Sequence, residues 1–180
     1  MCSINSLIIR LKFMLNNNAP VVYRVVSQER ANYINVGDVI NSPVENPDFV
    51  CSPLKMFAED CFERVRLEVF ESCPSRKSCL FVLPHDCQIV DQWVFEHYPH
   101  SDWNYVLLTL KLDGELIWCD EDIYSNFAVD HSSNVENSLA QQYWVSANSA
   151  DYSMFLMPEG LFVGRALVLK KEDKQHKGIQ

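Results

Sequence analysis

An amphipathic helix is the strongest structural signal in this sequence. Ser52 is a suitable N-cap, Pro53 fits the first helical position, and residues 53–71 run without a helix breaker until Pro74. Apolar side chains recur there at spacings of three and four, which indicates one helix face. We expect this face to point into the core, with Leu54, Phe57, Cys61 and Val65 inside. The charged residues should be solvated: Glu59, Glu63, Arg64, Arg66 and Glu68.

Strand patterns lie on both sides of this helix. The expected strands are residues 21–26, 78–83, 105–112, 115–118, 153–157 and 161–169. Asp113 and Gly114 form a pair typical of a hairpin turn. Shorter helices are expected after Asp86, from Asp120 and over residues 135–144. Because helices do not alternate strictly with strands, the pattern favours an α+β fold over a doubly wound parallel sheet.

The length of 180 residues favours one domain, which we expect over residues 19–170. Residues 1–18 are expected to form an N-terminal appendage, and residues 171–180 a charged, frayed tail. The apolar stretch at residues 7–15 is interrupted by Arg10 and Lys12. It is too short for a membrane span or a signal peptide, so no membrane association is expected.

Charge and cysteine content exclude some classes of function. Fifteen Lys and Arg against 24 Asp and Glu give a net charge of −9, so the overall field does not hold the chain on nucleic acid. The seven cysteines include no C-x-x-C pair, so no metal site is expected. An odd number of cysteines without paired spacing is typical of a reduced, cytoplasmic protein.

Two motifs place a cation in or beside an expected strand. Tyr23 and Arg24 lie inside the first strand, where an arginine is costly to bury unless it is paired or faces a cleft. Ser75 and Arg76 lie in the loop before residues 78–83, where an arginine can grip a phosphate through two hydrogen bonds. The structural alternatives are an edge arginine in solvent and a solvated loop.

Two further motifs supply aromatic rings and a carboxylate. Tyr143 and Trp144 end an expected helix, and such a pair is either core or a stacking platform for a planar ring. Glu159 lies on an expected turn before the last strand, where a carboxylate can polarise a hydroxyl or stabilise a developing cation. The structural alternative for Glu159 is a plain turn.

These four motifs, in this order, resemble the landmarks of the ADP-ribosyltransferase superfamily over residues 21–169. The resemblance is to an uncharacterised bacterial branch with Y-[H/R]-V, P-S-R and Y-W motifs. It implies split, mixed β-sheets around a cleft that binds NAD as a substrate, with a long helix on one side.

The resemblance also implies roles for individual residues. Arg24, with its neighbour Tyr23, matches the first-strand position that contacts the adenosine side of NAD. Ser75 and Arg76 match the motif that supports the nicotinamide-side ribose. An aromatic residue of that family stacks on nicotinamide, and this chain offers Tyr143 and Trp144.

The catalytic residue implied by the resemblance is a glutamate near the last strands. It holds the ribose 2′-hydroxyl and stabilises the oxocarbenium ion, and Glu159 is the nearest match. In related chains the acidic residue can lie a few positions earlier, where this chain has Ser153 and Met154. In that register the chain is an inactive relative, or it uses Asp151.

The function implied is therefore an NAD-dependent ADP-ribosyltransferase that acts on a macromolecular acceptor, either protein or nucleic acid. Such a small transferase is expected to be a bacterial or phage toxin or defence effector, with an antitoxin or a chaperone as a partner. Two alternatives stay open. The first is a non-catalytic binding module on the same fold, either an inactive relative or an immunity partner. The second is an unrelated α+β hydrolase with a serine or cysteine nucleophile, such as Cys87 with His131.

Overall fold

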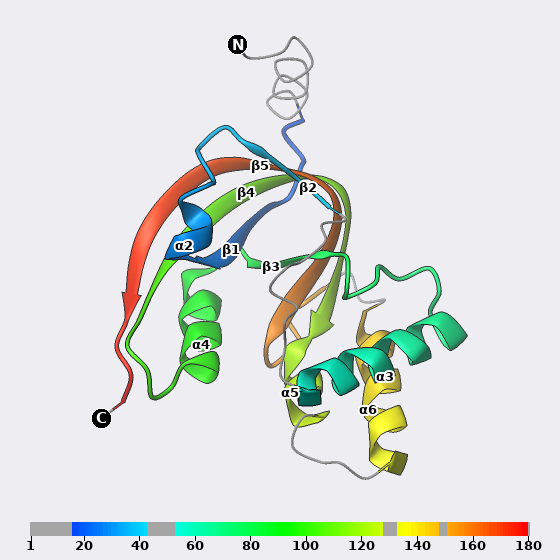
Figure 1. Cartoon of the computed structure of the whole chain (residues 1–180). Helices are drawn as coiled ribbons and strands as arrows, with labels where there is room; N and C mark the ends of the chain where they lie inside the picture. Colours follow the sequence, from blue (N-terminus) through cyan, green and yellow to red (C-terminus); the bar gives the residue numbers. More distant parts are fainter. Residues whose placement is uncertain (1–15, 43–52, 128–132, 148–150, 180) are drawn as a thin grey trace. The chain divides into compact units, whose positions relative to one another are not determined.

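The computed structural model describes residues 16–42, 53–127, 133–147 and 151–179. The described residues form two compact units (Figure 1). Unit 1 comprises residues 16–41, 82–114 and 164–179, and unit 2 comprises residues 42, 53–81, 115–127, 133–147 and 151–163. Helices and an antiparallel sheet occur together, which confirms the α+β class. The expected appendage lies mostly outside the described residues.

The strands of the described residues belong to one sheet with the order β2-β5-β3-β1-β4 (Figure 1). Their bounds are β1 Val21–Ser27, β2 Val39–Asn41, β3 Leu80–Pro84, β4 Trp103–Asp120 and β5 Pro158–His176. Strand β1 pairs antiparallel with β3 and β4, and β2 pairs antiparallel with β5. These pairings join the strands in one sheet where two sheets were expected, and β4 additionally pairs with β5.

Strand β4 shows that the expected hairpin at Asp113 and Gly114 is wrong. The strand continues through both residues without a turn. Gly114 has a φ of 158°, which is close to fully extended backbone. Asp113 also forms an ion pair with Arg165 of β5, which favours the extended course of the strand.

Strand β5 differs from the expectation at both ends. It begins at Pro158, so Glu159 is its second residue and does not lie on a turn. Residues 153–157, which precede it, form turns and bends instead of the expected strand. Asp120 fixes their course, because its carboxylate accepts hydrogen bonds from the backbone N–H groups of Leu156 and Met157. At the other end β5 continues to His176, so the expected frayed end is wrong for residues 171–176.

In unit 1, helix α4 (Cys87–His97) covers a small apolar cluster. As expected, Asp86 caps this helix, and its carboxylate accepts a hydrogen bond from the Gln88 N–H at 2.8 Å. The cluster is formed by Leu83, Val90, Val94, Tyr105 and Leu107. A short helix, α2 (Gln28–Ala31), follows β1 directly.

In unit 2, three helices enclose a larger core. They are α3 (Pro53–Val69), α5 (Glu121–Phe127) and α6 (Ser133–Ser146), and α6 contacts both of the others (Figure 1). The ring of Phe62 lies at the centre of this core and meets three aromatic rings edge to face: Tyr124, Phe127 and Tyr143. The long helix predicted over residues 53–71 is confirmed as far as Val69.

The buried face of α3 is rotated from the expected one. Cys61 and Val65 are buried as expected, but Phe57 is 49% exposed, so its assignment to the core is wrong. Glu59 and Arg66 are buried, so the expectation that they are solvated is also wrong. Each of these two charged side chains has a partner of opposite charge, which allows the helix to turn them inward. Ser52 and the side chain of Leu54 lie outside the described residues.

The rotated face predicts unequal costs for two phenylalanine truncations on α3. Phe62→Ala removes a fully buried ring and should lower the free energy of unfolding by about 3–5 kcal/mol. Phe57→Ala removes a half-exposed ring and should cost about 1 kcal/mol or less. Urea denaturation of both variants measures the difference. Equal losses would mean that the buried face of α3 is not the one described.

Candidate functional site

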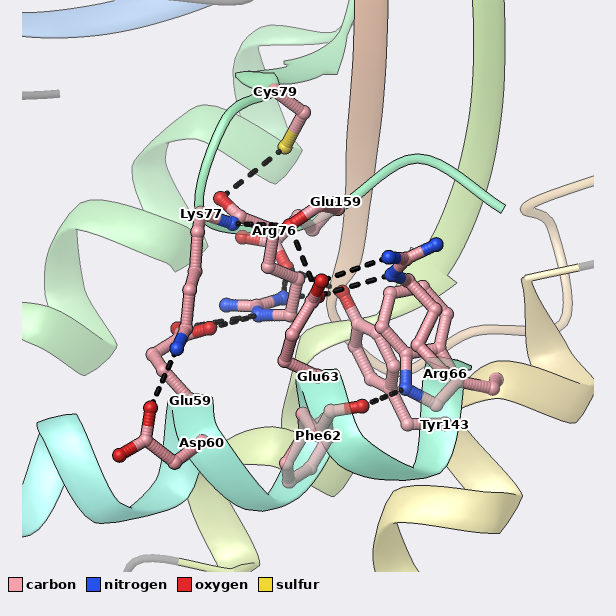
Figure 2. A network of polar contacts seen from close by, with 12 residues as sticks. Glu59, Asp60, Phe62, Glu63, Arg66, Arg76, Lys77, Cys79, Tyr143 and Glu159 are labelled. Atoms are coloured by element: carbon pink, nitrogen blue, oxygen red, sulfur yellow. Dashed lines mark hydrogen bonds and ion pairs between the residues drawn. The ribbon is translucent and has the colours of Figure 1, made fainter. Parts of the chain in front are cut away.

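Arg76 lies at the centre of a buried polar cluster in unit 2 (Figure 2). Its Nε lies 3.2 Å from each carboxylate oxygen of Glu59 on α3. Its Nη1 donates to Glu159 Oε1 at 2.5 Å and to the hydroxyl of Tyr143 on α6. The Tyr143 hydroxyl in turn donates to Glu159 Oε1 at 3.0 Å. One guanidinium therefore joins two carboxylates and a phenol from three elements.

Aromatic rings surround the Arg76 guanidinium. Its Cζ lies 4.2 Å from the ring centroid of Tyr124, 4.9 Å from that of Phe81 and 5.0 Å from that of Tyr143. A cation over an aromatic face is attracted by the ring quadrupole, whose face has a negative potential. The rings therefore offset part of the cost of removing this charge from water.

Burial changes the acid strength of Glu159. Removal from water raises the pKa of its carboxyl, Arg76 opposes this effect, and the nearby Glu121 reinforces it. Arg76 keeps its positive charge, because the two carboxylates beside it raise the pKa of the guanidinium although burial alone would lower it. The cluster thus combines a permanent cation with a carboxyl whose pKa is raised above its ordinary value.

Ser75 belongs to a second, adjacent network. Its hydroxyl donates to Glu63 Oε2 at 2.9 Å and accepts a hydrogen bond from the Lys77 N–H. Glu63 also pairs with both Nε and Nη2 of Arg66, and this hydrogen bonding lowers the pKa of its carboxyl (Figure 2). Nη1 of Arg66 donates to the backbone carbonyls of Glu71 and Cys73. This network therefore fixes the loop that carries Ser75 and Arg76.

Tyr143 and Trp144 are both fully buried. The Trp144 Nε1–H donates to the carbonyl of Phe62 at 2.8 Å, and the two neighbouring rings meet edge to face. Neither ring has a face open to solvent, so stacking on nicotinamide would require the core to open. The role of either ring in NAD binding stays a prediction.

Tyr23 and Arg24 lie in unit 1, on opposite faces of β1. Tyr23 packs with the cluster under α4, whereas Arg24 lies on the face of the buried Val22 and Val26. A ligand on one face of β1 would therefore meet only one of the two side chains directly. Their contacts with NAD also stay predictions.

Cys87 begins α4 and is exposed, with its Sγ 3.7 Å from the Tyr23 hydroxyl. The Tyr23 ring also packs on the His85 ring, with centroids 4.4 Å apart. His131, the other half of the predicted dyad, lies outside the described residues. Asp151, the alternative carboxylate, is exposed and accepts hydrogen bonds from the N–H and hydroxyl of Ser153.

Three of the residues selected from the sequence thus meet directly: Arg76, Tyr143 and Glu159. Sequence reasoning missed Glu59 and Tyr124, which complete the cluster. A signal was present for Glu59, because Glu59, Phe62 and Arg66 recur at helical spacing along one edge of the apolar face. A charged residue at such a position indicates a buried partner.

The fold and the cluster define an α+β protein with a buried arginine–carboxylate site. Residues 11–174 match the protein family DUF2441, which is described as a protein of unknown function, and the chain belongs to this family. No match was found among curated proteins. Within the described residues, no helix is both long and apolar enough to cross a membrane.

Loss of the buried cation should destabilise the protein strongly. Arg76→Met leaves two buried carboxylates without their partner, and we expect a loss of about 3–5 kcal/mol in the free energy of unfolding. The adjacent Lys77 is the matched control, because its ion pair with Asp60 is exposed and Lys77→Ala should cost about 1 kcal/mol or less. Thermal and urea unfolding measure both. Equal, small losses would contradict a structural role for the Arg76 cluster.

Exposure predicts which described cysteine reacts first with a thiol reagent. Cys87 is exposed, whereas Cys61, Cys73, Cys79 and Cys119 are buried, and burial raises the pKa of Cys73 and Cys119. In the folded protein, labelling with an aromatic disulfide followed by peptide mapping should modify Cys87 before these four. Cys87→Ser should remove that label. Faster labelling of any of the four would contradict the described burial.

Proposed function

We propose that the protein is an NAD-dependent ADP-ribosyltransferase. The observation that supports this proposal best is the meeting of Arg76, Tyr143 and Glu159, which were selected from separate motifs. Arg76 and Glu159 are 83 positions apart in the sequence, and their side chains nevertheless lie 2.5 Å apart. A carboxylate held beside a cation and a phenol is a preorganised group of the kind that stabilises developing charge.

In this proposal Glu159 is the catalytic carboxylate. Nicotinamide leaves the ribose with the pair of electrons of the glycosidic bond, and positive charge develops on the ribose. The ionised carboxylate of Glu159 accepts a hydrogen bond from the 2′-hydroxyl and stabilises that charge. Arg76 and Tyr143 hold Oε1 of Glu159 in place, which leaves Oε2 for the ribose hydroxyl.

The acceptor in this proposal is a macromolecule, whose nucleophilic atom forms the new bond to the anomeric carbon of the ribose and releases its proton to solvent. The activity is that of a cytoplasmic toxin or defence effector regulated by an antitoxin or chaperone. A net charge of −9 favours a protein over a nucleic acid as the acceptor.

A second candidate function is a non-catalytic binding module of the same fold. The burial of the cluster favours it, since the exposed fractions of Arg76 and Glu159 are only 5% and 7%. In this alternative the cluster only stabilises unit 2, and a surface of the protein binds a macromolecular partner. The two candidates differ in whether wild-type protein consumes NAD.

The test measures nicotinamide release from labelled NAD, with cell lysate as the source of acceptor, alongside calorimetric NAD binding. Glu159→Gln keeps the shape of the side chain and removes its charge. NAD binding should change little, while turnover should fall by about a hundredfold or more. Glu68→Gln is the matched control, because Glu68 is an exposed glutamate of unit 2 on α3. It should retain turnover.

The other outcomes separate the candidates. If Glu159→Gln turns over NAD as wild type does, Glu159 is not the catalytic carboxylate, and Asp151→Asn is the next variant. If wild type neither binds nor cleaves NAD with lysate present, the transferase proposal fails and the binding module replaces it.

A further inference from the structure

We propose that Glu59 is a positioning residue for Glu159, because it holds one edge of the Arg76 guanidinium and thereby directs the other edge to Glu159 and Tyr143. Neither the sequence motifs nor the family resemblance includes Glu59. Its role rests on the proposed function, in which Glu159 is the catalytic carboxylate, but its effect on Glu159 can be measured without NAD.

The Arg76 guanidinium has hydrogen-bond partners on two of its edges. Nε faces Glu59, with both carboxylate oxygens at 3.2 Å, and Nη1 faces Glu159 and Tyr143. The guanidinium is rigid and planar, so fixing Nε also fixes the direction of Nη1. Glu59 is 4% exposed and projects from the middle of α3, which is anchored in the core through Phe62 and Val65. The helix therefore sets the orientation of the arginine through Glu59.

Glu59 and Glu159 share the single positive charge of Arg76. Because one cation faces two carboxylates in a buried site, it stabilises the ionised form of each less than it would stabilise one carboxylate alone. Glu59→Gln removes the charge of Glu59 but keeps an amide oxygen that accepts from Nε, so the arginine keeps its orientation and Glu159 becomes its main anionic partner. Glu159 should then lose its proton at lower pH, because an opposite charge favours the ionised form of a carboxyl.

Other titratable groups around Glu159 act in the same site. They come from α5, α6, β4 and the loop before β3, and they are Glu121, Tyr124, Tyr143, Cys119 and Arg76. Burial raises the pKa of Tyr124, Tyr143 and Cys119, so these three groups stay neutral near neutral pH. Glu121 reinforces the raised pKa of Glu159.

The test follows the carboxyl carbon of Glu159 by NMR of protein labelled with 13C at glutamate side chains. The Glu159→Gln spectrum assigns the signal. In wild type the midpoint of its titration should lie above the ordinary range of a glutamate. In Glu59→Gln the midpoint should fall by about one pH unit or more. Glu68→Gln is the control on the same helix and should leave the midpoint unchanged, because Glu68 is exposed and solvent screens its charge.

An unchanged midpoint in Glu59→Gln, or an equal shift in Glu68→Gln, would overturn the proposal. A merely structural role for Glu59 would lower thermal stability without moving this midpoint. If Glu59→Gln does not fold, Glu59→Asp replaces it. The shorter side chain keeps the charge but no longer fixes Nε, so Nη1 is not directed at Glu159 and the midpoint should rise. No shift in that variant would overturn the proposal.

A kinetic arm connects this role to the proposed function. Catalysis requires ionised Glu159, so the rate of nicotinamide release should rise with pH as this group loses its proton. In Glu59→Gln that rise should move to lower pH by the same amount as the NMR midpoint. A shifted midpoint without nicotinamide release in wild type would support the role of Glu59 and reject the transferase proposal. Nicotinamide release with an unshifted midpoint would support the transferase proposal and reject the role of Glu59.

Discussion

The structure of unit 2 depends on a charge that has been taken out of water. Placing a guanidinium in an apolar core is costly unless its donors and its charge are matched. Here Glu59 and Glu159 supply the opposite charge, Tyr143 accepts a hydrogen bond, and three aromatic rings surround the cation. These partners come from different helices and from β5, so satisfying the arginine also fixes how those elements pack. A hydrophobic core alone would fix them less specifically, because apolar contacts have no direction.

Local patterns in the sequence correctly predicted those elements that depend on residues close together in the sequence. The β-branched run of β1, the spacing of α3 and the capping Asp86 each act within a few residues, and the structure confirms all three. Turns were less predictable, because the Asp113-Gly114 pair also fits an extended strand when the strands on either side are paired. The orientation of α3 failed for a related reason. Phe57 is more apolar than Glu59, but Glu59 has a buried partner 17 positions away, and the spacing along the helix does not identify which residue that partner is.

Part of the candidate site could likewise be found from the sequence. The motifs identified Arg76, Tyr143 and Glu159, and these residues meet. They did not indicate that Tyr23 and Arg24 point to opposite faces of a strand, although the alternation of side chains along β1 requires it. Membership of the DUF2441 family leaves the activity open, so the chemistry of the cluster carries the functional argument. The two candidate functions require different properties of the cluster. A transferase requires that a substrate reach Glu159, whereas a binding module requires only that the cluster stay closed.

The division of the chain between the two units has a consequence for its synthesis. The chain passes between the units four times, so neither unit corresponds to an uninterrupted stretch of sequence. A chain growing on the ribosome contains Glu59 and Arg76 long before Glu159, which follows Arg76 by 83 residues. Until then the arginine has only part of its final environment. Contacts between such distant residues also slow folding, because a long loop must close before they form. The final quarter of the chain therefore completes the core of unit 2, and an incomplete chain exposes that core to chaperones and proteases.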